Sequence, residues 1–519
     1  MNYMDIVKKI NHVNIAEMHE NEIYIEVKKE AFKEACTILH KDLNSQVLMM
    51  FAEDARKESH DFKLYCVFLS AALKKWFLIK TSIPSDIRKF DALSKQIHSA
   101  SAFEREINES FGLEAEGAVD LRRLNLHDEV WPKGHYPLLK DFQNPSGSTE
   151  KSEYLFTKIQ GEGIFEIPVG PVHAGIIGPG HFRFSVAGEP IINLEERLGF
   201  THRGIEKLFE GKTVKEALAL SECISGETAF AYSLAFCMAI EKIFGILVSS
   251  QHKILRAIFL ELERMYNHVA DIGGIALDVG FSFPANYAAI IKENILSVNN
   301  LLTNSRYLKG INKIGGVSKE LDDRDKKMLI DFLVSQEKDF SNLKDMLLEN
   351  ASFMDRVETT GILRKKTAKD LGVTGVAARA SGLPIDLRNI FSEVYKDINF
   401  KVITEQKGDV LARLNVRIGE FMESLNLIRR FIGKVETAGS PSLNPEPKKG
   451  VALGFCEAWR GTLIFWIKTD GHGIIERCKI VDPSVHNWEG LTFAVIGNIV
   501  PDFPVCNKSF NLSYPGNDL

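Results

Sequence analysis

The chain has 519 residues, of which 45% are hydrophobic and 26% are charged, and its formal net charge is -5 with a pI near 6.3. This composition excludes a disordered or fibrous protein, and the length suffices for two or three domains with sizeable cores. The chain also lacks the basic excess that neutralises phosphates, so we expect no nucleic-acid partner.

The N-terminal part reads as a small α/β domain. Residues 1–21 contain no apolar core segment, so we expect no signal peptide there. Residues 22–27 alternate as a half-buried strand, and residues 47–51 and 62–69 read as further strands between polar turns. These strands predict an α/β domain over residues 1–142.

A polar, turn-rich segment over residues 143–152 predicts a linker to a second domain over residues 153–519. That domain opens with Gly- and Pro-rich strands and turns over residues 164–192. Apolar residues then recur at helical spacing over 254–269, 325–349 and 411–431. We expect the first of these helices to end at Gly273-Gly274 and the last at Gly433. The pattern predicts a mainly α, helix-bundle (α+β) domain with short strands at both ends.

Neither a membrane span nor a complete iron–sulfur site is expected in this chain. The apolar stretch over residues 228–240 ends at Glu241, short of the ~18 residues that a span needs. The cysteines include no close pair, which argues against a cluster ligated wholly by this chain; they are Cys36, Cys66, Cys223, Cys237, Cys456, Cys478 and Cys506. Any cluster that it uses is expected on another polypeptide, and any membrane attachment through partners.

Common nucleotide and hydrolase motifs are absent from the sequence. Gly211-Lys212-Thr213 ends like a phosphate-binding loop, but Glu206 stands where that loop needs glycine. Residues 178–180 lack the third glycine and the preceding apolar strand of a dinucleotide fingerprint. No nucleophile-elbow pattern supports a hydrolase. We therefore expect neither an ATP nor a nicotinamide site.

Polar motifs interrupt the apolar helices of the second domain in a fixed order. They occupy residues 170–175, 180–184, 202–208, 261–268, 355–356, 374–375, 379–382, 386–388 and 408–409. Together they resemble the large subunit shared by complex I, as its quinone-site subunit, and membrane-bound, energy-converting nickel-iron hydrogenases. The resemblance covers residues 160–519. Residues 103–106, 111–112 and 120–123 resemble the smaller complex I peripheral-arm subunit, which is fused to the large one in formate-hydrogenlyase-type proteins.

In the hydrogenases of this family, two Cys-x-x-Cys pairs hold the metals. The first pair falls here on Ser225 and Thr228, and the second, aligned on Asp502, falls on residues 504 and 507 with Cys506 one residue away. Nickel and low-valent iron need soft thiolates, which hydroxyls replace poorly. The sequence therefore predicts no nickel-iron centre, although a genuine hydrogenase with unusual ligands stays as an alternative.

The resemblance implies roles for several further residues. In hydrogenases the Arg of Glu-Ala-Pro-Arg-Gly lies over the metals, which places Arg460 in the same cavity, although Trp459 replaces the proline. Complex I uses that cavity for a quinone, with a His in the first strand turn, a role for His181 or His173. Its Tyr position holds Gly226. Tyr232 points into the cavity from a neighbouring turn or is an interior tyrosine satisfied locally.

Glu206 is the strongest functional candidate. Both branches of the family have Arg-Gly-x-Glu here, and in hydrogenases this Glu passes protons to and from the metal site. With Arg203 and Lys207 beside it, we expect its pKa to be tuned across physiological pH. The alternative is a helix N-terminal carboxylate in a surface ion pair.

One predicted helix carries polar residues among its apolar positions, namely Arg256, Glu263, Arg264, Asn267 and His268. Residues four apart share a helix face, so we expect two polar pairs on common faces. Such residues suit a buried network that couples the cavity to a membrane arm. Plain interhelical hydrogen bonding needs such residues too and is the favoured interpretation, although the sequence alone does not separate the two.

The sequence thus predicts an electron-transfer subunit of a membrane-associated, complex-I-like oxidoreductase that has lost its nickel ligands. We expect no cofactor held by this chain alone, an iron–sulfur cluster in a small-subunit partner, antiporter-like membrane partners, and a quinone or other small molecule as acceptor. The place expected for it is the cytoplasmic face of the inner membrane, with partners providing the attachment. A non-catalytic structural or coupling subunit is the alternative from a different class.

Overall fold

The computed structural model describes residues 3–10, 13–145, 152–174, 177–436, 439 and 446–519. Its N-terminal part is built on a five-stranded sheet of order β1-β2-β5-β4-β3. The strands are β1 (Asn14–His19), β2 (Glu22–Glu26), β3 (Met49–Asp54), β4 (Asp61–Ser70) and β5 (Lys75–Pro84). The strands predicted over 22–27, 47–51 and 62–69 are confirmed as β2, β3 and β4. Within this five-stranded sheet, β2 and β5 pair in parallel and the other described neighbours pair antiparallel.

Short helices and strands complete the N-terminal part. They are α1 (Tyr3–Val7), α2 (Lys29–Leu43), α3 (Arg56–Ser59), β6 (Lys89–Asp91), η1 (His98–Ala100), α4 (Ser101–Phe111) and β7 (Glu114–Glu116). The helix α2 packs on β4 and β5, and α4 packs on β3. The helix α4 brings carboxylates to the second part of the chain.

The second part begins with the predicted strands and turns. A three-stranded antiparallel sheet contains β8 (Ile164–Val169), β9 (His181–Ala187) and β10 (Ile191–Arg197), in the order β10-β9-β8. After it come α5 (Ile205–Phe209), α6 (Val214–Ser221), the 3-10 turn η2 (Gly226–Thr228) and α7 (Ala229–Phe244). Nearly every residue of α7 is buried, which explains its apolar sequence.

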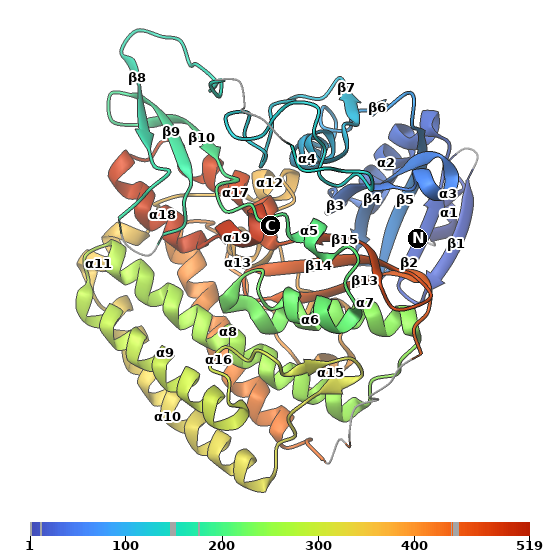
Figure 1. The fold of residues 1–519 in the computed structure, drawn as a ribbon. Coiled ribbons are helices and arrows are strands. Elements are labelled where there is room, and N and C mark those ends of the chain that lie inside the picture. The colour runs from blue at the N-terminus through green and yellow to red at the C-terminus, as the bar shows by residue number, and fades with distance from the viewer. Residues whose placement is uncertain (1–2, 11–12, 146–151, 175–176, 437–438, 440–445) are drawn as a thin grey trace.

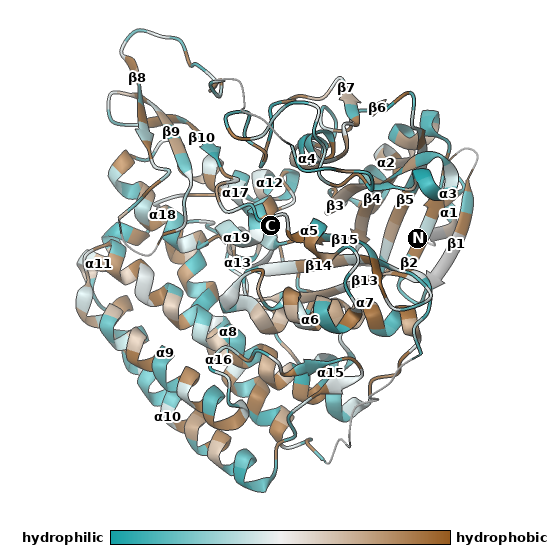
Figure 2. Ribbon diagram, viewed as in Figure 1, coloured by the Kyte–Doolittle hydropathy of each residue, from teal (hydrophilic) through white to brown (hydrophobic). Residues whose placement is uncertain are grey.

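Long helices form the bundle, and Figure 1 shows α8, α9 and α10 side by side with α16 against them. They are α8 (Ser250–Asp278), α9 (Ser282–Thr303), α10 (Asp323–Leu348) and α16 (Val410–Ile432). The helices predicted over 325–349 and 411–431 are confirmed, and α16 ends at Gly433. In Figure 2, teal polar residues alternate with brown apolar ones along α9 and α10, as expected for amphipathic helices at a surface.

The predicted end of the first helix at Gly273-Gly274 is wrong, because α8 continues to Asp278. These glycines permit close packing instead of ending the helix. A Cβ on Gly273 would lie 2.8 Å from the Cβ of Ala288 in α9, and one on Gly274 would lie 2.8 Å from the side chain of Lys508. Helical glycines at such contacts let neighbouring elements approach closely, and here that advantage outweighs their low helix propensity.

A second antiparallel sheet, of order β13-β14-β15, forms the centre of the molecule. It consists of β13 (Gly450–Ala458), β14 (Gly461–Thr469) and β15 (Ile475–Val481). The helix α7 packs on β13 and β14. The other face meets the N-terminal sheet, where the Trp466 ring lies 4.8 Å from Phe51 and 5.1 Å from Tyr65.

Shorter elements link the bundle to this sheet and close the chain. Those before the sheet are β11 (Asn312–Lys313), β12 (Gly316–Val317), α11 (Ala351–Val357), α12 (Lys365–Asp370), α13 (Gly375–Ala380), α14 (Leu387–Phe391) and α15 (Glu393–Lys396). Those after it are α17 (Pro483–Ala494), η3 (Val500–Asp502), α18 (Phe503–Phe510) and α19 (Tyr514–Asp518). The C-terminal helices bring the end of the chain back to α5 and α8 (Figure 1).

The apolar core of the N-terminal part continues into the β13–β15 sheet through Leu453, Phe455, Ile464 and Trp466. The domain boundary predicted near residues 143–152 stays a prediction, and residues 146–151 of that linker lie outside the described residues. Among the described helices, no single one is long and apolar enough to cross a membrane. Taken together, α6 and the segment formed by η2 and α7 reach that length and composition, but the chain bends by 112° between them.

Candidate functional site

The residues at the first metal-ligand pair form a compact polar cluster at the start of α7. Ser225 Oγ donates a hydrogen bond to Glu227 Oε1 (2.7 Å) and lies 2.9 Å from Ser513 Oγ. Arg460 Nη1 donates to the same Glu227 oxygen (2.7 Å), and its Nε donates to the carbonyl of Asn511 (2.6 Å). The structure therefore brings Ser225 and Arg460 together, as predicted from the resemblance.

A tight turn of the central sheet positions Arg460. Ala458 pairs with Gly461, so Trp459 and Arg460 form the two-residue loop of the β13–β14 hairpin. Gly375, at φ +66°, supports this loop because a Cβ there would lie 1.8 Å from the Arg460 carbonyl oxygen. The left-handed backbone and the close approach both require glycine at residue 375.

Trp459 and Thr228 satisfy each other at the second ligand position. The Trp459 Nε1–H donates to Thr228 Oγ1 (3.0 Å), and the Arg460 guanidinium stacks 4.0 Å above the Trp459 ring. All three side chains are buried. The residue that departs from the hydrogenase pattern thus binds the hydroxyl that replaces the thiolate.

These residues do not fit a nickel-iron centre. Hydroxyls are hard, weak donors for such metals, and both are engaged by protein side chains. Cys506 lies apart from these two hydroxyls and packs against Gly361, where an added Cβ would be 2.7 Å from its Sγ. Burial raises the pKa of the Cys506 thiol to about 12. Within the described part of the chain, no group of three or more His, Cys, Asp or Glu residues is arranged to hold a metal ion.

Tyr232 lies in the interior next to this cluster. Its hydroxyl donates to Asp482 Oδ2 (2.5 Å), and the side chain is fully buried. Burial, together with the Asp482 charge, raises the pKa of Tyr232 well above its ordinary value. Asp482 also caps α17 by accepting the Ser484 N–H (2.8 Å). A local partner therefore satisfies Tyr232.

Glu206 lies in the first turn of α5, and β15 supplies its partners. Arg477 Nη1 donates to it (2.7 Å), Lys479 Nζ lies 3.1 Å away, and the Ile480 N–H donates at 3.1 Å. Burial alone would raise the pKa of Glu206, but Lys479 and Arg477 outweigh it and hold the pKa below its ordinary value. The carboxylate is ionised at neutral pH.

Two expectations about Glu206 are wrong. Its predicted neighbours make other contacts: Arg203 donates to the carbonyls of Cys223 and Ile224, and Lys207 donates to Leu139 O and Glu210. The alternative of a surface ion pair also fails, because the side chain is only 6% exposed. The sequence neighbours point away from Glu206 because α5 is short and packs its buried face against β15.

The two candidate histidines lie in and beside the β8–β9 turn. His173 Nε2 contacts Gly180 O (2.8 Å), and His181 Nδ1 contacts Gly170 O (3.2 Å). His181 Nε2 is buried without a hydrogen-bond partner among the described residues. Burial lowers the pKa of His181, so the ring is neutral at pH 7 and Nε2 is free to exchange a hydrogen bond with a ligand.

The sequence analysis missed Tyr514, which lies against this turn. Its ring packs so closely that a Cβ on Gly178 would lie 2.5 Å from it and one on Gly180 would lie 2.8 Å from it. The hydroxyl is buried without a partner in the described structure. Tyr514 is far from the turn in sequence and no motif contains it, so only the fold reveals the contact.

Asp502 and Cys506, which the second ligand segment suggested, contact residues other than Ser225 and Thr228. Asp502 accepts a hydrogen bond from Arg356 (3.0 Å) at the surface. Residues further along the C-terminal segment, Asn511 and Ser513, make the contacts with the Arg460 cluster instead. A search for metal ligands could not find them, because their backbone and hydroxyl contacts leave no motif.

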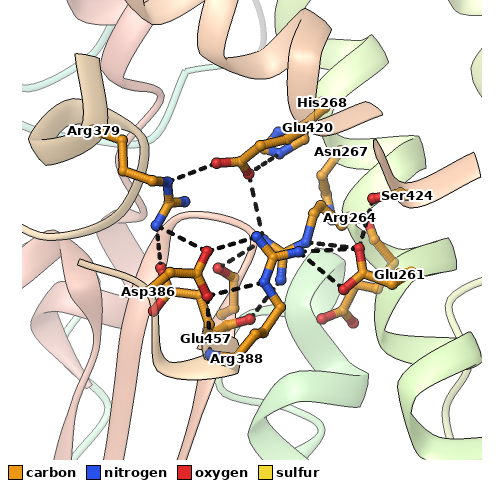
Figure 3. Close-up of polar contacts among 12 residues, drawn as sticks. Glu261, Arg264, Asn267, His268, Arg379, Asp386, Arg388, Glu420, Ser424 and Glu457 are labelled. Carbon is orange, nitrogen blue, oxygen red and sulfur yellow. Dashed lines mark hydrogen bonds and ion pairs between the residues drawn. The ribbon is translucent and has the colours of Figure 1, made fainter. Parts of the chain in front are cut away.

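Two of the predicted polar residues of α8, Arg264 and His268, belong to a buried charge network (Figure 3). Glu261 accepts hydrogen bonds from Arg388 (3.0 Å), Arg264 (3.1 Å), Ser424 (2.6 Å) and Tyr395 (2.6 Å). A second centre is Glu420, which binds Arg379 Nε (2.7 Å) and His268 Nε2 (2.8 Å), and Arg379 continues to Glu457 (2.6 Å). Nearly every carboxylate in the network faces at least one arginine.

The other predicted polar residues of α8 hold neighbouring elements. Glu263 accepts the N–H groups of Phe230 (2.8 Å) and Ala231 (3.1 Å) at the start of α7, and Arg256 binds Glu241. Asn267 donates to the carbonyl of Glu227 (2.9 Å) in the cluster described above. The polar face of α8 thus runs from the charge network to the Arg460 cluster.

Two family descriptions match separate parts of the chain. Residues 25–148 match the 30 Kd subunit of respiratory-chain NADH dehydrogenase, and residues 278–449 match its 49 Kd subunit. These matches and the fold define a redox-complex subunit in which two respiratory-chain subunits are fused. The chain is 30% identical to formate hydrogenlyase subunit 5 of Escherichia coli over 511 residues, covering 96% of this chain and 89% of the relative.

It is also 28% identical to NADH-quinone oxidoreductase subunit 4 of Thermus thermophilus, over 65% of this chain and 90% of that one. A chain in the structure of the membrane-bound sulfane sulfur reductase, an archaeal respiratory membrane complex, superposes with a TM-score of 0.65 at 25% identity, covering 69% of this chain and 99% of that chain. The chain therefore belongs to the large-subunit family shared by complex I and the energy-converting nickel-iron hydrogenases.

Proposed function

We propose that this chain is an electron-transfer subunit of a membrane-associated, complex-I-like oxidoreductase that works without a nickel-iron centre. Electrons arrive from an iron–sulfur cluster in a small-subunit partner and reduce a small acceptor near Arg460 and the β8–β9 turn. Antiporter-like membrane partners hold the complex at the cytoplasmic face of the membrane and couple reduction to ion movement. Acceptor reduction consumes protons, and Glu206 lies on their route.

The observation that carries the proposal is the pairing of Trp459 with Thr228. At this position the Thr228 hydroxyl accepts the indole N–H of Trp459 at 3.0 Å, and the Arg460 guanidinium stacks on the Trp459 ring. The site therefore presents hydrogen-bond donors, and not a thiolate, to the interior. Donors suit an acceptor molecule that gains negative charge as it is reduced.

Unpaired groups near the β8–β9 turn suggest the acceptor's chemistry. His181 Nε2 and the Tyr514 hydroxyl are both buried without hydrogen-bond partners in the described structure, and unpaired buried polar groups are costly unless a ligand or water uses them. The Tyr514 hydroxyl can donate to a quinone carbonyl oxygen. The neutral His181 ring donates through Nδ1 to the Gly170 carbonyl, so its Nε2 can accept a hydrogen bond from a quinol hydroxyl. Two related proteins are a quinone oxidoreductase subunit and a chain of a sulfane sulfur reductase complex, so quinones and polysulfide are the acceptors to compare.

The test uses the complete complex, purified without oxygen, in wild-type form and with Glu206→Gln. Nickel and iron are measured per complex, and turnover is followed with a quinone and with polysulfide in sealed vesicles. We expect iron equal to the partner's clusters, no nickel, acceptor reduction by the wild-type complex, and a large loss of coupled turnover in E206Q. Nickel near one per chain would instead restore hydrogenase chemistry, and a wild-type rate in E206Q would contradict the proton route.

A non-catalytic coupling subunit is the second candidate, and one observation favours it. Ser225, Glu227, Thr228 and Arg460 satisfy one another, so the cluster is complete without a ligand. In that case the complex reduces neither acceptor, yet Arg460→Ala destabilises it. Acceptor reduction that depends on His181 and Tyr514 would exclude this candidate.

A further inference from the structure

A cavity of about 310 Å³ separates the N-terminal part of the chain from α5 and the C-terminal segment. The carboxylates that line it include Glu106 and Glu109 of α4, Glu196 of β10, and Glu206 of α5. At about 30 Å³ per water molecule, the volume suffices for on the order of ten waters. His98 and Glu489 also line the cavity and are 45% and 39% exposed, so it reaches solvent.

Several polar atoms at the cavity have no partner. Glu196 Oε2 and Trp488 Nε1 are each buried without a hydrogen bond in the described structure, and both residues line the cavity. The Tyr514 ring packs against Trp488, with the two ring centroids 4.9 Å apart, behind this wall of the cavity. Unpaired polar groups are rarely left bare, and a polar cavity of this size lets water satisfy them.

A ladder of charges along one wall of the cavity joins Glu106 to Glu206. Lys479 binds Glu106 on one side and approaches Glu206 on the other at 3.1 Å. Arg477 then closes the ladder at 2.7 Å from Glu206. Lys479 is nearly fully buried, whereas the Glu106 side chain is 20% exposed. The ladder thus joins the partly exposed carboxylate of Glu106 to the buried carboxylate of Glu206.

We propose that this cavity is a hydrated proton-loading chamber for Glu206, in which Glu196 and Glu106 exchange protons with solvent water. The proposal rests on the proposed function, because it supplies the protons that acceptor reduction consumes. It assigns the fused N-terminal part a task beyond assembly: α4 provides one of the chamber's two exchanging carboxyls. A proton enters at Glu196 or Glu106, moves along water, and is taken up by the ionised carboxylate of Glu206, which then releases the same proton toward the acceptor.

The charges that face these carboxyls suit the task. Burial, with Glu489 adding to it and Arg105 opposing it, raises the pKa of Glu196 well above its ordinary value. Burial also raises the pKa of Glu106, against the pull of Lys479. Glu109 instead accepts the N–H groups of residues 124, 125 and 126 and serves as a fixed brace. His202, Lys207, Arg197 and Asp518 face the remaining walls.

The test compares Glu196→Gln and Glu106→Gln with Glu166→Gln as the matched control. Glu166 is on β8 of the same small sheet as Glu196, and it pairs with Arg183 at 2.9 Å outside the cavity. Gln has the shape of a protonated Glu but cannot release a proton. The infrared spectrum of the purified chain should lose a carboxylic-acid C=O band in E196Q only. In the complete complex, E196Q and E106Q should slow turnover on the order of tenfold, below the ~10²–10⁴ of a direct acid–base group.

The outcomes separate this inference from the proposed function. If E206Q slows turnover but E196Q and E106Q match the E166Q control, the chamber is wrong and the proposed function stands. If E206Q also turns over at the wild-type rate, the proposed proton route fails and the chamber with it. An unchanged infrared spectrum in E196Q overturns the chamber without any measurement of turnover, because its carboxyl would then carry no proton.

Discussion

Replacing Glu261 by Gln decides whether the charge network of Figure 3 is a structural brace. Glu261 is fully buried and receives hydrogen bonds from two arginines, a serine and a tyrosine. The substitution keeps the shape but removes the negative charge. Arg264 and Arg388 then lose a counterion inside the protein, where an uncompensated charge is expensive.

Two routes give the same magnitude for this change. Removing one partner of a buried ion pair costs about 3–5 kcal/mol, and Arg388 keeps Asp386 (2.7 Å), which favours the lower end. Burial alone would raise the pKa of Glu261, but Arg388 and Arg264 hold it at about 2 instead of 4.5. At about 1.4 kcal/mol per pKa unit, that difference corresponds to about 3 kcal/mol.

The assay is urea unfolding of the purified chain, with Glu293→Gln as control. Glu293 pairs with Arg306 at the surface, where the side chains are 56% and 43% exposed, so we expect the control variant to unfold at the same urea concentration as the wild type. Because the pKa of Glu261 is lowered, its contribution to the free energy of unfolding is fully present above about pH 4.5 and is lost as pH falls toward 2. The unfolding free energy of E261Q should lack this part of the pH dependence. A loss below about 1 kcal/mol in E261Q refutes the brace, and intact stability with failed ion coupling favours the coupling interpretation.

Two further predictions test packing and a histidine pair. Gly273→Ala should destabilise the chain by about 1–3 kcal/mol, because the new Cβ would lie 2.8 Å from Ala288 of α9. In Gly274→Ala the new Cβ meets only the flexible side chain of Lys508, so stability should change by under about 1 kcal/mol. Thermal unfolding of both variants tests the difference. The hydrogen bond to Glu489 raises the pKa of His98. The pair therefore stabilises the fold below the unfolded-state pKa of about 6.5, and this contribution is lost as pH rises through the higher folded-state pKa. An NMR titration of His98 that is unchanged in Glu489→Gln would contradict this prediction.

Local patterns predicted three strands of the N-terminal sheet and long helices of the bundle, and the errors arose where tertiary packing decides. The strands over 22–27 and 62–69 and the helices over 325–349 and 411–431 follow from periodicity, because each buries one regular face. Gly273 was misread because a glycine that ends a helix and one that admits a neighbouring helix look alike in sequence. Only the contact with Ala288 distinguishes them.

The candidate site was predictable only where a motif contains its residues. The resemblance brought Ser225, Thr228 and Arg460 to one place, because all three belong to motif segments of the family. The partners of Glu206 come from β15, more than 270 residues later along the chain. Long-range pairing of charges depends on the finished topology, and neighbours in sequence are poor guides to it.

The strand β15 sets the distance between the proton residues and the Arg460 cluster. Lys479 of this strand approaches Glu206, and Asp482, three residues on, binds Tyr232 at 2.5 Å. The Ile480 N–H also donates to Glu206, so the backbone that holds Glu206 is two residues from Asp482, roughly 7 Å along an extended chain, whereas direct proton transfer needs about 2.6–3.2 Å. An acceptor reduced near Arg460 therefore cannot take a proton from Glu206 directly. Water or a hydroxyl must lie between them, and the buried Tyr232 hydroxyl, already committed to Asp482, can serve only if that bond breaks during turnover.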